Sequence, residues 1–358
     1  MSIIQIKTLT QVHIGNGSFL QQGNDFVVNN EGNNSDVYIL SIDRLSKLIG
    51  IDVTSVSLWM KSIEDGDSAS FLKKYIQGHP YTEYAKRRIT NYAKFSSKSL
   101  TLKECIHDGM GRPYIPGSSI KGAIRTAILA YLAGDIIQAA IAECNTPEER
   151  KKTIVGMEKR LLGRTTDTDV FRFLCTGDAF FQRGSEIAVK QINLNITEND
   201  RLKDLSKNQI VEAIGADETS SFRLTIQERF FEHTKIKGEQ GLFEVINNHT
   251  RKLVEEEIDY WDGYAEDVQD YVASMEDILN VINDCRPDEC VLRIGQGSGW
   301  RFITGAWLEA VNPDVFRNEI VPLCRPKNNL HYRQYDFPKT RRIDDESYMF
   351  GFVKLRIK

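Results

Sequence analysis

The chain has 358 residues, of which 41% are hydrophobic and 27% are charged, and its formal net charge is −4 at pH 7. This charge excludes a uniformly basic coat for nucleic acid but permits a local basic surface. The sequence contains no apolar run near the roughly 18 residues that span a bilayer, and its N-terminus lacks the basic start and apolar block of a signal peptide. We therefore expect a cytoplasmic protein that contacts no membrane, with a core large enough for two domains.

The six cysteines are scattered through the chain and include no C-x-x-C pair. They are Cys105, Cys144, Cys175, Cys285, Cys290 and Cys324. A disulfide framework is not expected without a secretory signal. Cys285 and Cys290 have four residues between them, a loose spacing for zinc, and no histidine follows nearby before His331. We expect buried thiols, no metal and no cofactor.

The first strand is predicted from the alternation of polar and apolar residues over residues 3–14. Its apolar positions share one face and are Ile4, Ile6, Val12 and Ile14. The turn that ends it contains Gly15, Asn16 and Gly17 and lies just after His13. This turn is either a plain hairpin turn or a place where the backbone approaches a nucleic acid closely. Residues 26–28 and 37–40 predict a hairpin, and residues 41–50 predict a short helix.

A basic and aromatic segment extends from Pro80 to Ala130, with nine Lys/Arg and three Asp/Glu. Its basic residues are Lys86, Arg87, Arg88, Lys94, Lys98, Lys103, Arg112, Lys121 and Arg125, interleaved with Tyr81, Tyr84, Tyr92 and Phe95. Single-stranded RNA needs both types, because cations hold phosphates and aromatic rings stack on bases. The alternative is a solvated helix face above core aromatics.

A central helix is predicted after the turn at residues 116–117, with Ser118 and Ser119 as caps and Gly134 near its end. Its apolar face is Ile120, Ile124, Ile128 and Tyr131. Lys121 and Arg125 lie on neighbouring turns of one face. Free N–H groups, hydroxyls and cations together suit a phosphate. The alternative is a capped core helix with solvated cations.

The second half of the chain begins near residue 185, which gives predicted domains of 1–185 and 186–358. Before it, residues 146–162 predict a helix, and Asp178 is interpreted as a turn cap because a lone carboxylate is weak support for catalysis. After it, residues 187–196 and 221–231 alternate as strands. Residues 251–284 predict one long amphipathic helix with a very acidic outer face.

A glycine-rich loop follows a predicted strand at residues 291–300. Its glycines, Gly295, Gly297 and Gly299, permit close approach to phosphates, and Ser298, Trp300 and Arg301 lie among and after them. The spacing is G-x-G-x-G, which is neither a dinucleotide-binding fingerprint nor a Walker loop. In the basic tail, Lys339, Arg341 and Arg342 form a cationic cluster that suits phosphates, or else a solvated charged turn.

Several of these stretches, in this order, resemble the RAMP superfamily of CRISPR proteins, and within it the family of the fifth subunit of type III-A (Csm) effector complexes. The matching stretches are residues 12–17, 115–125, 178–179, 291–300, 337–343 and 350–357. The resemblance therefore extends over nearly the whole chain. Relatives usually have proline just before the first motif, where this chain has Gln11.

This resemblance implies an α+β fold of two ferredoxin-like (RRM-like) domains, each βαββαβ, with helical and loop insertions. It implies a CRISPR RNA-binding subunit, not an enzyme, that caps the backbone of the complex at the 3′ end of the CRISPR RNA and assists its maturation in antiviral defence. Its partners would be CRISPR RNA, neighbouring backbone subunits and host ribonucleases that do the cutting. The implied RNA contacts are His13, Gly15, Asn16, Gly17, Ser118, Ser119, Lys121, Arg125, Gly295, Gly297, Ser298, Gly299, Trp300, Arg301, Lys339, Arg341 and Arg342.

Two catalytic alternatives stay open at this point. Other RAMP proteins cut repeat RNA without metal, and His13, His107, Tyr114 and Lys121 offer the general base, general acid and cation that such chemistry needs. A metal-dependent target-RNA nuclease would use an aspartate, but no carboxylates cluster near a basic motif. A binding subunit is therefore the favoured interpretation.

Overall fold

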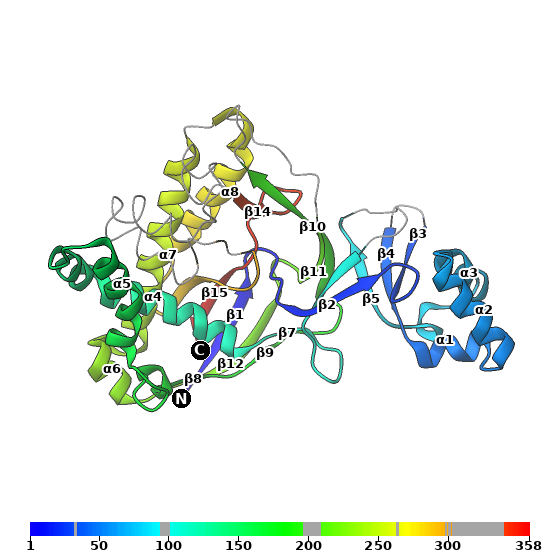
Figure 1. Ribbon diagram of the computed structural model, residues 1–358, viewed down its shortest axis with the longest axis horizontal. Coiled ribbons are helices and arrows are strands. Elements are labelled where there is room, and N and C mark those ends of the chain that lie inside the picture. Colours follow the sequence, from blue (N-terminus) through cyan, green and yellow to red (C-terminus); the bar gives the residue numbers. More distant parts are fainter. Residues whose placement is uncertain are drawn as a thin grey trace.

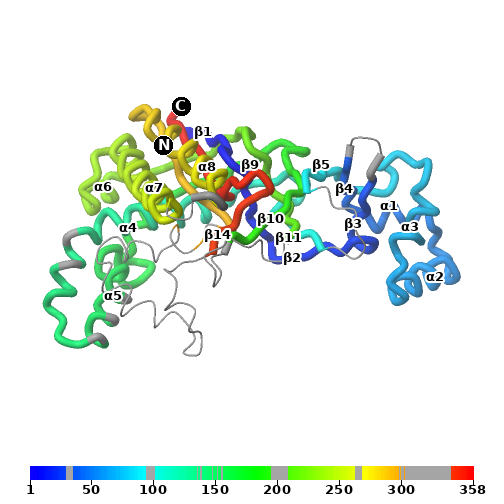
Figure 2. Tube along the Cα trace, turned by 90° about the horizontal axis from the view of Figure 1, so that it is seen from above, coloured from blue at the N-terminus to red at the C-terminus, as the bar shows by residue number. Residues whose placement is uncertain are grey.

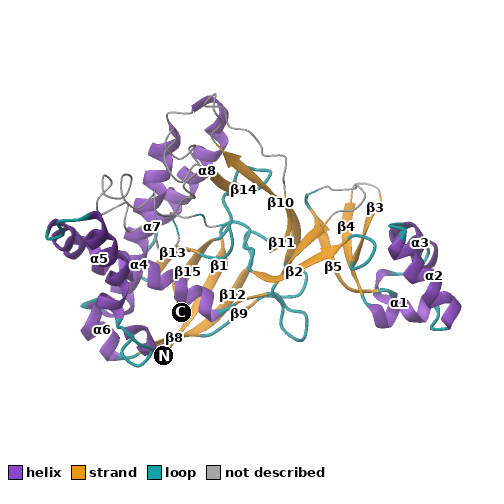
Figure 3. Cartoon of the chain, viewed as in Figure 1, coloured by secondary structure: helices purple, strands orange, loops and turns teal. Residues whose placement is uncertain are grey.

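The computed structural model of the protein describes residues 1–31, 34–93, 101–195, 209–262, 265–297, 299, 302 and 340–358. Its strands are β1 (Ser2–Thr8), β2 (Gly15–Gln21), β3 (Phe26–Glu31), β4 (Asn34–Leu40), β5 (Ala85–Asn91), β6 (Thr101–Cys105), β7 (Tyr114–Ile115), β8 (Leu174–Thr176), β9 (Ala179–Phe180), β10 (Glu186–Asn195), β11 (Gln209–Ile214), β12 (Thr219–Ile226), β13 (Glu289–Arg293), β14 (Thr340–Ile343) and β15 (Phe352–Ile357). Its α-helices are α1 (Ile42–Ile49), α2 (Val53–Glu64), α3 (Ser68–Ile76), α4 (Gly117–Ala142), α5 (Pro147–Leu162), α6 (Glu228–Thr234), α7 (Gly238–Asp262) and α8 (Ala265–Asn283). The molecule is elongated, with sheets in the middle and helices towards both ends (Figures 1 and 3).

The first sheet has the strand order β13-β15-β1-β12-β8, and all of its neighbouring strands are antiparallel. In chain order, β1, α4, β8, β12, α7 and β15 supply a βαββαβ unit with insertions. Its fourth strand lies beside the first, and its third strand lies between the first and the second, which is the ferredoxin-like arrangement. The predicted α+β class with ferredoxin-like architecture is therefore confirmed.

The largest core lies between this sheet and helices α4 and α7. Ile4 and Ile6 of β1 are fully buried there, as the predicted alternation requires. Ile120 and Ile124 of α4 pack against the same cluster, together with Leu242 of α7. Their four-residue spacing places the isoleucines on one side of the helix. Burial of this apolar area is the main force that holds the two helices on the sheet.

The second sheet has the order β2-β6-β11-β10-β5-β4-β3, and β14 pairs with the far end of β10. It curves away from the first sheet towards a lobe made of the β3–β4 hairpin and helices α1, α2 and α3 (Figures 1 and 2). Both sheets combine strands from before and after residue 185. The division into domains 1–185 and 186–358 stays a prediction.

Several local predictions are confirmed and others are wrong. The hairpin of residues 26–40 forms, and Thr146 and Glu149 build a capping box at the start of α5. The predicted single helix of residues 251–284 is two helices, α7 and α8, which pack against each other so that the apolar stripe becomes their shared interface. The predicted strand 221–231 ends at Ile226, because helix α6 begins at Glu228.

The central helix also departs from its prediction. It continues to Ala142 and is kinked at Gly134, where the backbone is not helical, so Gly134 bends the helix and does not end it. Tyr131 is 50% exposed and does not belong to the buried face. Among the described cysteines, Cys105 and Cys290 are buried, Cys175 is exposed, and none forms a disulfide.

Candidate nucleic-acid interface

Two glycine motifs from opposite ends of the chain contact each other directly. The amide of Gln296, in the loop after β13, donates to the carbonyl oxygen of His13 at 2.9 Å. Gly295 has a φ of +84°, and a Cβ atom built there would lie 2.7 Å from that same oxygen. Only glycine permits this approach. The loop after β13 therefore lies against the turn of Gly15 and Gly17 that begins β2.

Arg342 of β14 joins the same surface. Its Nη1 atom donates to Oε1 of Gln191 on β10 at 2.8 Å. Gly297 lies beside both residues, because a Cβ atom built there would lie 3.1 Å from Nε2 of Gln191 and 3.7 Å from Cβ of Arg342. Three of the motifs that the sequence singled out thus meet in space.

Lys103 of β6 supplies a second cation next to Arg342. Its Cε atom would lie 3.5 Å from a Cβ atom built on Gly15. Burial, with added repulsion from Arg342, lowers the pKa of Lys103. Among the residues that the structure describes, neither cation forms an ion pair with a carboxylate. Two neighbouring cations without an acidic partner favour an anionic ligand such as phosphate.

An exposed aromatic ring stands beside this cation pair. Phe19 of β2 is 52% exposed, and Nζ of Lys103 lies 5.7 Å from the centroid of its ring. Asn16 and Gly17 are exposed on the same strand. A base can stack on such a ring while its phosphate contacts the cations.

His13 is placed inside the protein and not on this surface. Its side chain is fully buried, and Nδ1 donates to the carbonyl oxygen of Glu212 at 2.6 Å. Burial lowers the pKa of His13 to about 4, although the hydrogen bond with the Glu212 carbonyl partly opposes the shift. A neutral, buried imidazole supports the Gly15 turn from below and cannot contact RNA directly.

The start of helix α4 is capped differently from the prediction. Its N-cap is Pro116, and neither Ser118 nor Ser119 makes a capping bond from the N-cap position. Instead, Oδ1 of Asp178 accepts a hydrogen bond from the amide of Gly117 at 2.7 Å. A carboxylate from a distant turn therefore already satisfies the helix dipole where a phosphate was expected. Asp178, interpreted from the sequence as the cap of a turn, does cap backbone, but at the start of a distant helix.

The two cations of α4 have different surroundings. Arg125 bridges Glu158 and Asp169, with its Nε 2.9 Å from Oε1 of the first and its Nη1 2.9 Å from Oδ2 of the second. It also lies 5.0 Å from the ring centroid of Phe171. Arg125 thus ties α5 and the segment before β8 to α4. Ser118 is exposed, and Lys121 is half-buried and forms no ion pair within the described residues.

Arg341, the neighbour of Arg342, points into the protein. Its Nη2 atom donates to Oε1 of Glu257 at 2.8 Å, and both side chains are almost completely buried. Trp261 and Tyr271 donate to the same carboxylate at 3.2 and 2.9 Å. Arg341 is therefore part of the packing between β14 and helices α7 and α8, and we do not count it as an RNA contact.

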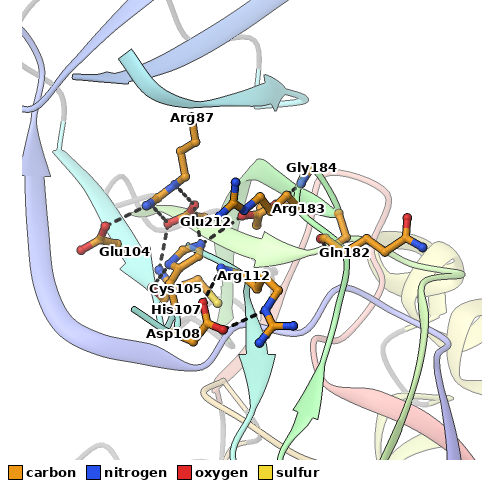
Figure 4. A network of polar contacts seen from close by, with 12 residues as sticks. Arg87, Glu104, Cys105, His107, Asp108, Arg112, Gln182, Arg183, Gly184 and Glu212 are labelled. Atoms are coloured by element: carbon orange, nitrogen blue, oxygen red, sulfur yellow. Dashed lines mark hydrogen bonds and ion pairs between the residues drawn. The ribbon is translucent and has the colours of Figure 1, made fainter. Parts of the chain in front are cut away.

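A second polar network joins strands β5, β6 and β11 through Arg87, Glu104 and Glu212 (Figure 4). Arg87 binds both oxygens of Glu212, at 3.1 and 2.9 Å, and Oε1 of Glu104 at 3.0 Å. His107 contacts the Cys105 carbonyl through Nδ1 at 2.8 Å and Glu186 through Nε2 at 3.1 Å. Burial raises the pKa of Glu212, while Arg87 and His107 oppose that shift.

This network bears on both catalytic alternatives. His13 and His107 do come together, since one contacts the backbone of Glu212 and the other lies 3.5 Å from its carboxylate. Nε2 of His13 is buried and has no hydrogen-bond partner among the described residues, whereas both ring nitrogens of His107 contact protein oxygens. Neither imidazole therefore presents a nitrogen to a substrate at the surface. Glu104, His107 and Glu212 also bring possible metal ligands within 4.8 Å of one another, but the Arg87 guanidinium already bridges the two carboxylates.

The remaining predicted contacts, Ser298, Trp300, Arg301 and Lys339, lie outside the described residues. Gly299 is described and has a φ of +66°. Sequence reasoning missed Phe19 as a candidate contact and did not separate Lys103 from the other basic residues of its segment. Phe19 and Lys103 are distinguished only by their position beside Arg342 and Gly15. That position depends on strands that are distant in sequence.

The sequence model of the RAMP superfamily matches residues 5–302 of this chain. The chain belongs to the RAMP superfamily. The resemblance that the motifs indicated is therefore confirmed. A curated protein named CRISPR system Cms protein Csm5, from Methanocaldococcus jannaschii, is 25% identical over 354 residues, which cover 92% of this chain and 76% of that protein.

Solved structures agree with this family assignment. One is a chain in a cryo-EM structure of a Csm–crRNA–target RNA ternary complex of a type III-A CRISPR-Cas system, with a TM-score of 0.72, 20% identity and complete coverage of both chains. Another is a crystal structure of Csm5 from T. onnurineus, with a TM-score of 0.65, 19% identity and coverage of 98% of this chain and 99% of that one. Both share the fold. Within the described residues, no helix has the length and apolar character needed to cross a membrane.

Proposed function

We propose that this protein is a CRISPR RNA-binding subunit of a type III-A effector complex, that it caps the backbone at the 3′ end of the RNA, and that it assists maturation without cutting RNA itself. Membership of the RAMP superfamily and similarity to Csm5 proteins support the type of complex. Its place of action would then be the cytoplasm, where guide RNA and backbone subunits meet. Host ribonucleases would trim the RNA end.

The single observation that carries the RNA-binding part is the Lys103–Arg342 pair. Two like charges held together repel each other, and a protein tolerates this where an anion binds between them. Phe19 provides a neighbouring base-stacking surface. The turn of Gly15, Asn16 and Gly17 and the loop of Gly295, Gly297 and Gly299 provide backbone close to that place. Phosphate contacts of this kind position RNA without reading its sequence.

The test compares the Lys103→Ala/Arg342→Ala variant with wild-type protein, each assembled with its partner subunits and end-labelled CRISPR RNA. We expect the variant to bind RNA more weakly. The slope of log K against log salt concentration should be smaller in magnitude by ~1.4, since each of the two lost phosphate contacts on single-stranded RNA contributes about 0.7. Affinity is measured by filter binding at salt concentrations from about 50 to about 300 mM, because counterion release dominates the salt dependence in roughly this range.

The matched control is Lys7→Ala/Arg356→Ala, which removes two surface cations of the first sheet whose acidic partners are Asp217 and Asp288. We expect its salt slope to equal that of wild-type protein. Equal slopes for the two double variants would contradict the proposed interface. In the same samples the RNA should stay uncut, and discrete cleavage in EDTA that disappears in His107→Gln would instead support the metal-independent ribonuclease.

A further inference from the structure

Helix α2 (Val53–Glu64) is 12 residues long and buries none of them. It belongs to the lobe of α1, α2 and α3, at the end of the molecule away from α5 and α6 (Figures 1 and 2). Trp59 is its contribution to the apolar core of that lobe, whereas α1 contributes the buried Leu45 and Ile49. A helix this short is marginal in water and is normally held by the packing of an apolar face. Among the described residues, α2 has little of that packing.

The exposed side of α2 carries an apolar row with the spacing of a coiled coil. Its members, which we call the α2 stripe, have exposed fractions between 38% and 85% and are Val53, Val56, Met60 and Ile63. Intervals of three, four and three residues place them along one side of the helix, as the a and d positions of a heptad are placed. Exposed apolar side chains in this arrangement can insert as knobs between the side chains of a second helix.

The charges around the α2 stripe are acidic. Residues 52–67 contain four carboxylates and one cation, Lys61. Asp52 and Glu64 occupy heptad positions g and e, which flank the stripe at its two ends and govern the choice of partner in coiled coils. Glu64 and Asp65 form no ion pair among the described residues. They lie at the C-terminal end of the helix, where the helix dipole favours cations.

This charge distribution decides between the possible occupants of the stripe. In a parallel pairing, a second copy of the chain would place Glu64 beside its own Glu64. An antiparallel pairing would place Asp52 beside Glu64 and Asp65, and like charges repel in both cases. RNA and anionic lipid would meet the same repulsion. A helix that carries cations beside its own apolar stripe matches both the apolar surface and the charge.

We propose that the α2 stripe docks an amphipathic helix of a partner protein, and that lysine or arginine occupies the positions flanking the apolar stripe of that helix. The cations of the partner pair with Glu64 and Asp65 and offset the unfavourable place of these carboxylates at the helix end. The Lys103–Arg342 surface belongs to other strands of the second sheet, so docking on α2 does not depend on the proposed RNA interface.

The test is fluorescence anisotropy of two labelled three-heptad peptides with the purified full chain. Both peptides have leucine at positions a and d, and one has lysine and the other glutamate at positions e and g. We expect saturable binding of the lysine peptide, tighter than binding of the glutamate peptide by about tenfold or more. Met60→Glu, which places a charge within the α2 stripe, should weaken binding of the lysine peptide by about tenfold or more.

Leu58→Glu is the matched control for Met60→Glu. Leu58 is similarly exposed but lies on the opposite side of α2, and the change in charge is the same. Its affinity for the lysine peptide should stay within about twofold of wild-type, and both variants should keep the wild-type melting temperature because both positions are exposed. Equal losses in the two variants, equal affinity for the two peptides or no saturable binding of the lysine peptide would each overturn the proposal.

Three further measurements separate a basic helix from other occupants. Glu64→Lys/Asp65→Lys should reverse the preference for the lysine peptide, and an unchanged preference would contradict a basic partner. Self-association in sedimentation equilibrium that Met60→Glu abolishes would assign the α2 stripe to a second copy of the chain. Binding to phosphatidylcholine vesicles that the same variant abolishes would assign it to a lipid surface. Either of these last two results would overturn the proposal.

Discussion

The two faces of strand β14 differ in whether an arginine side chain has a carboxylate partner. On one side, Arg341 is buried against Glu257, and the same carboxylate also accepts from Trp261 and Tyr271. On the other side, Arg342 lies beside Lys103 with no acidic partner among the described residues. The two arginines are adjacent in sequence, and a strand directs adjacent side chains to opposite faces.

The difference between the two arginines gives a criterion for distinguishing cations with a structural role from cations that are available to bind an anion. A charge moved into the protein interior needs a hydrogen-bonded counter-ion, and Glu257 supplies it for Arg341. A pair of surface cations without such a partner destabilises itself slightly and becomes favourable when an anion binds. Composition alone does not distinguish them, because both arginines belong to one basic cluster.

The largest expected effect is on the buried side. Arg341→Ala leaves the carboxylate of Glu257 buried without its cation, so the free energy of unfolding should fall by about 3–5 kcal/mol. Arg342→Ala should lower it by only about 1 kcal/mol, because it removes the donor of one neutral buried acceptor, Oε1 of Gln191, and orphans no charge. Urea denaturation of both variants measures this contrast. Similar losses in the two variants would remove the distinction between the two sides of β14.

The next effect concerns the buried imidazole beneath the glycine turn. The native pKa of His13 is about 4, below its value of 6.5 in the unfolded chain. As pH falls below 6.5, the unfolded chain gains a proton that the native protein does not, so stability decreases. From pH 7 to pH 5 this contribution is about 2 kcal/mol. Urea denaturation at both pH values should show a smaller loss in His13→Asn, and an equal loss would refute a neutral, buried His13.

The smallest effect separates two glycines on the loop side. Gly17 and Gly295 have similar positive φ angles, but a Cβ atom on Gly17 would meet nothing within 4 Å. Gly17→Ala should cost only the backbone strain, about 1 kcal/mol. Gly295→Ala should cost about 1 kcal/mol more because of its clash with the His13 carbonyl. Thermal unfolding of both variants measures the difference, which should vanish if the loop after β13 does not lie against His13.

Much of the local structure could be predicted from the sequence. The hairpin of residues 26–40 and the capping box at Thr146 depend on residues a few positions apart, so pattern and capping chemistry are sufficient. The family motifs likewise indicated the superfamily and the α+β fold. The helix of residues 251–284 was predicted wrongly because an apolar stripe has the same period whether it lies on one helix or on two helices that pack against each other.

The sequence by itself therefore determined the family, the α+β class, several local elements and most of the residues from which an RNA surface could be built. The tertiary structure decided which of them form it. Asp178 caps a helix that begins 61 residues earlier in the sequence. Arg341 pairs in the interior with Glu257, which is 84 residues away in the sequence. Lys103 and Arg342 meet only because their strands join one curved sheet. Electrostatic and hydrogen-bond partners are set by distance in space, and no periodicity along the chain encodes that distance.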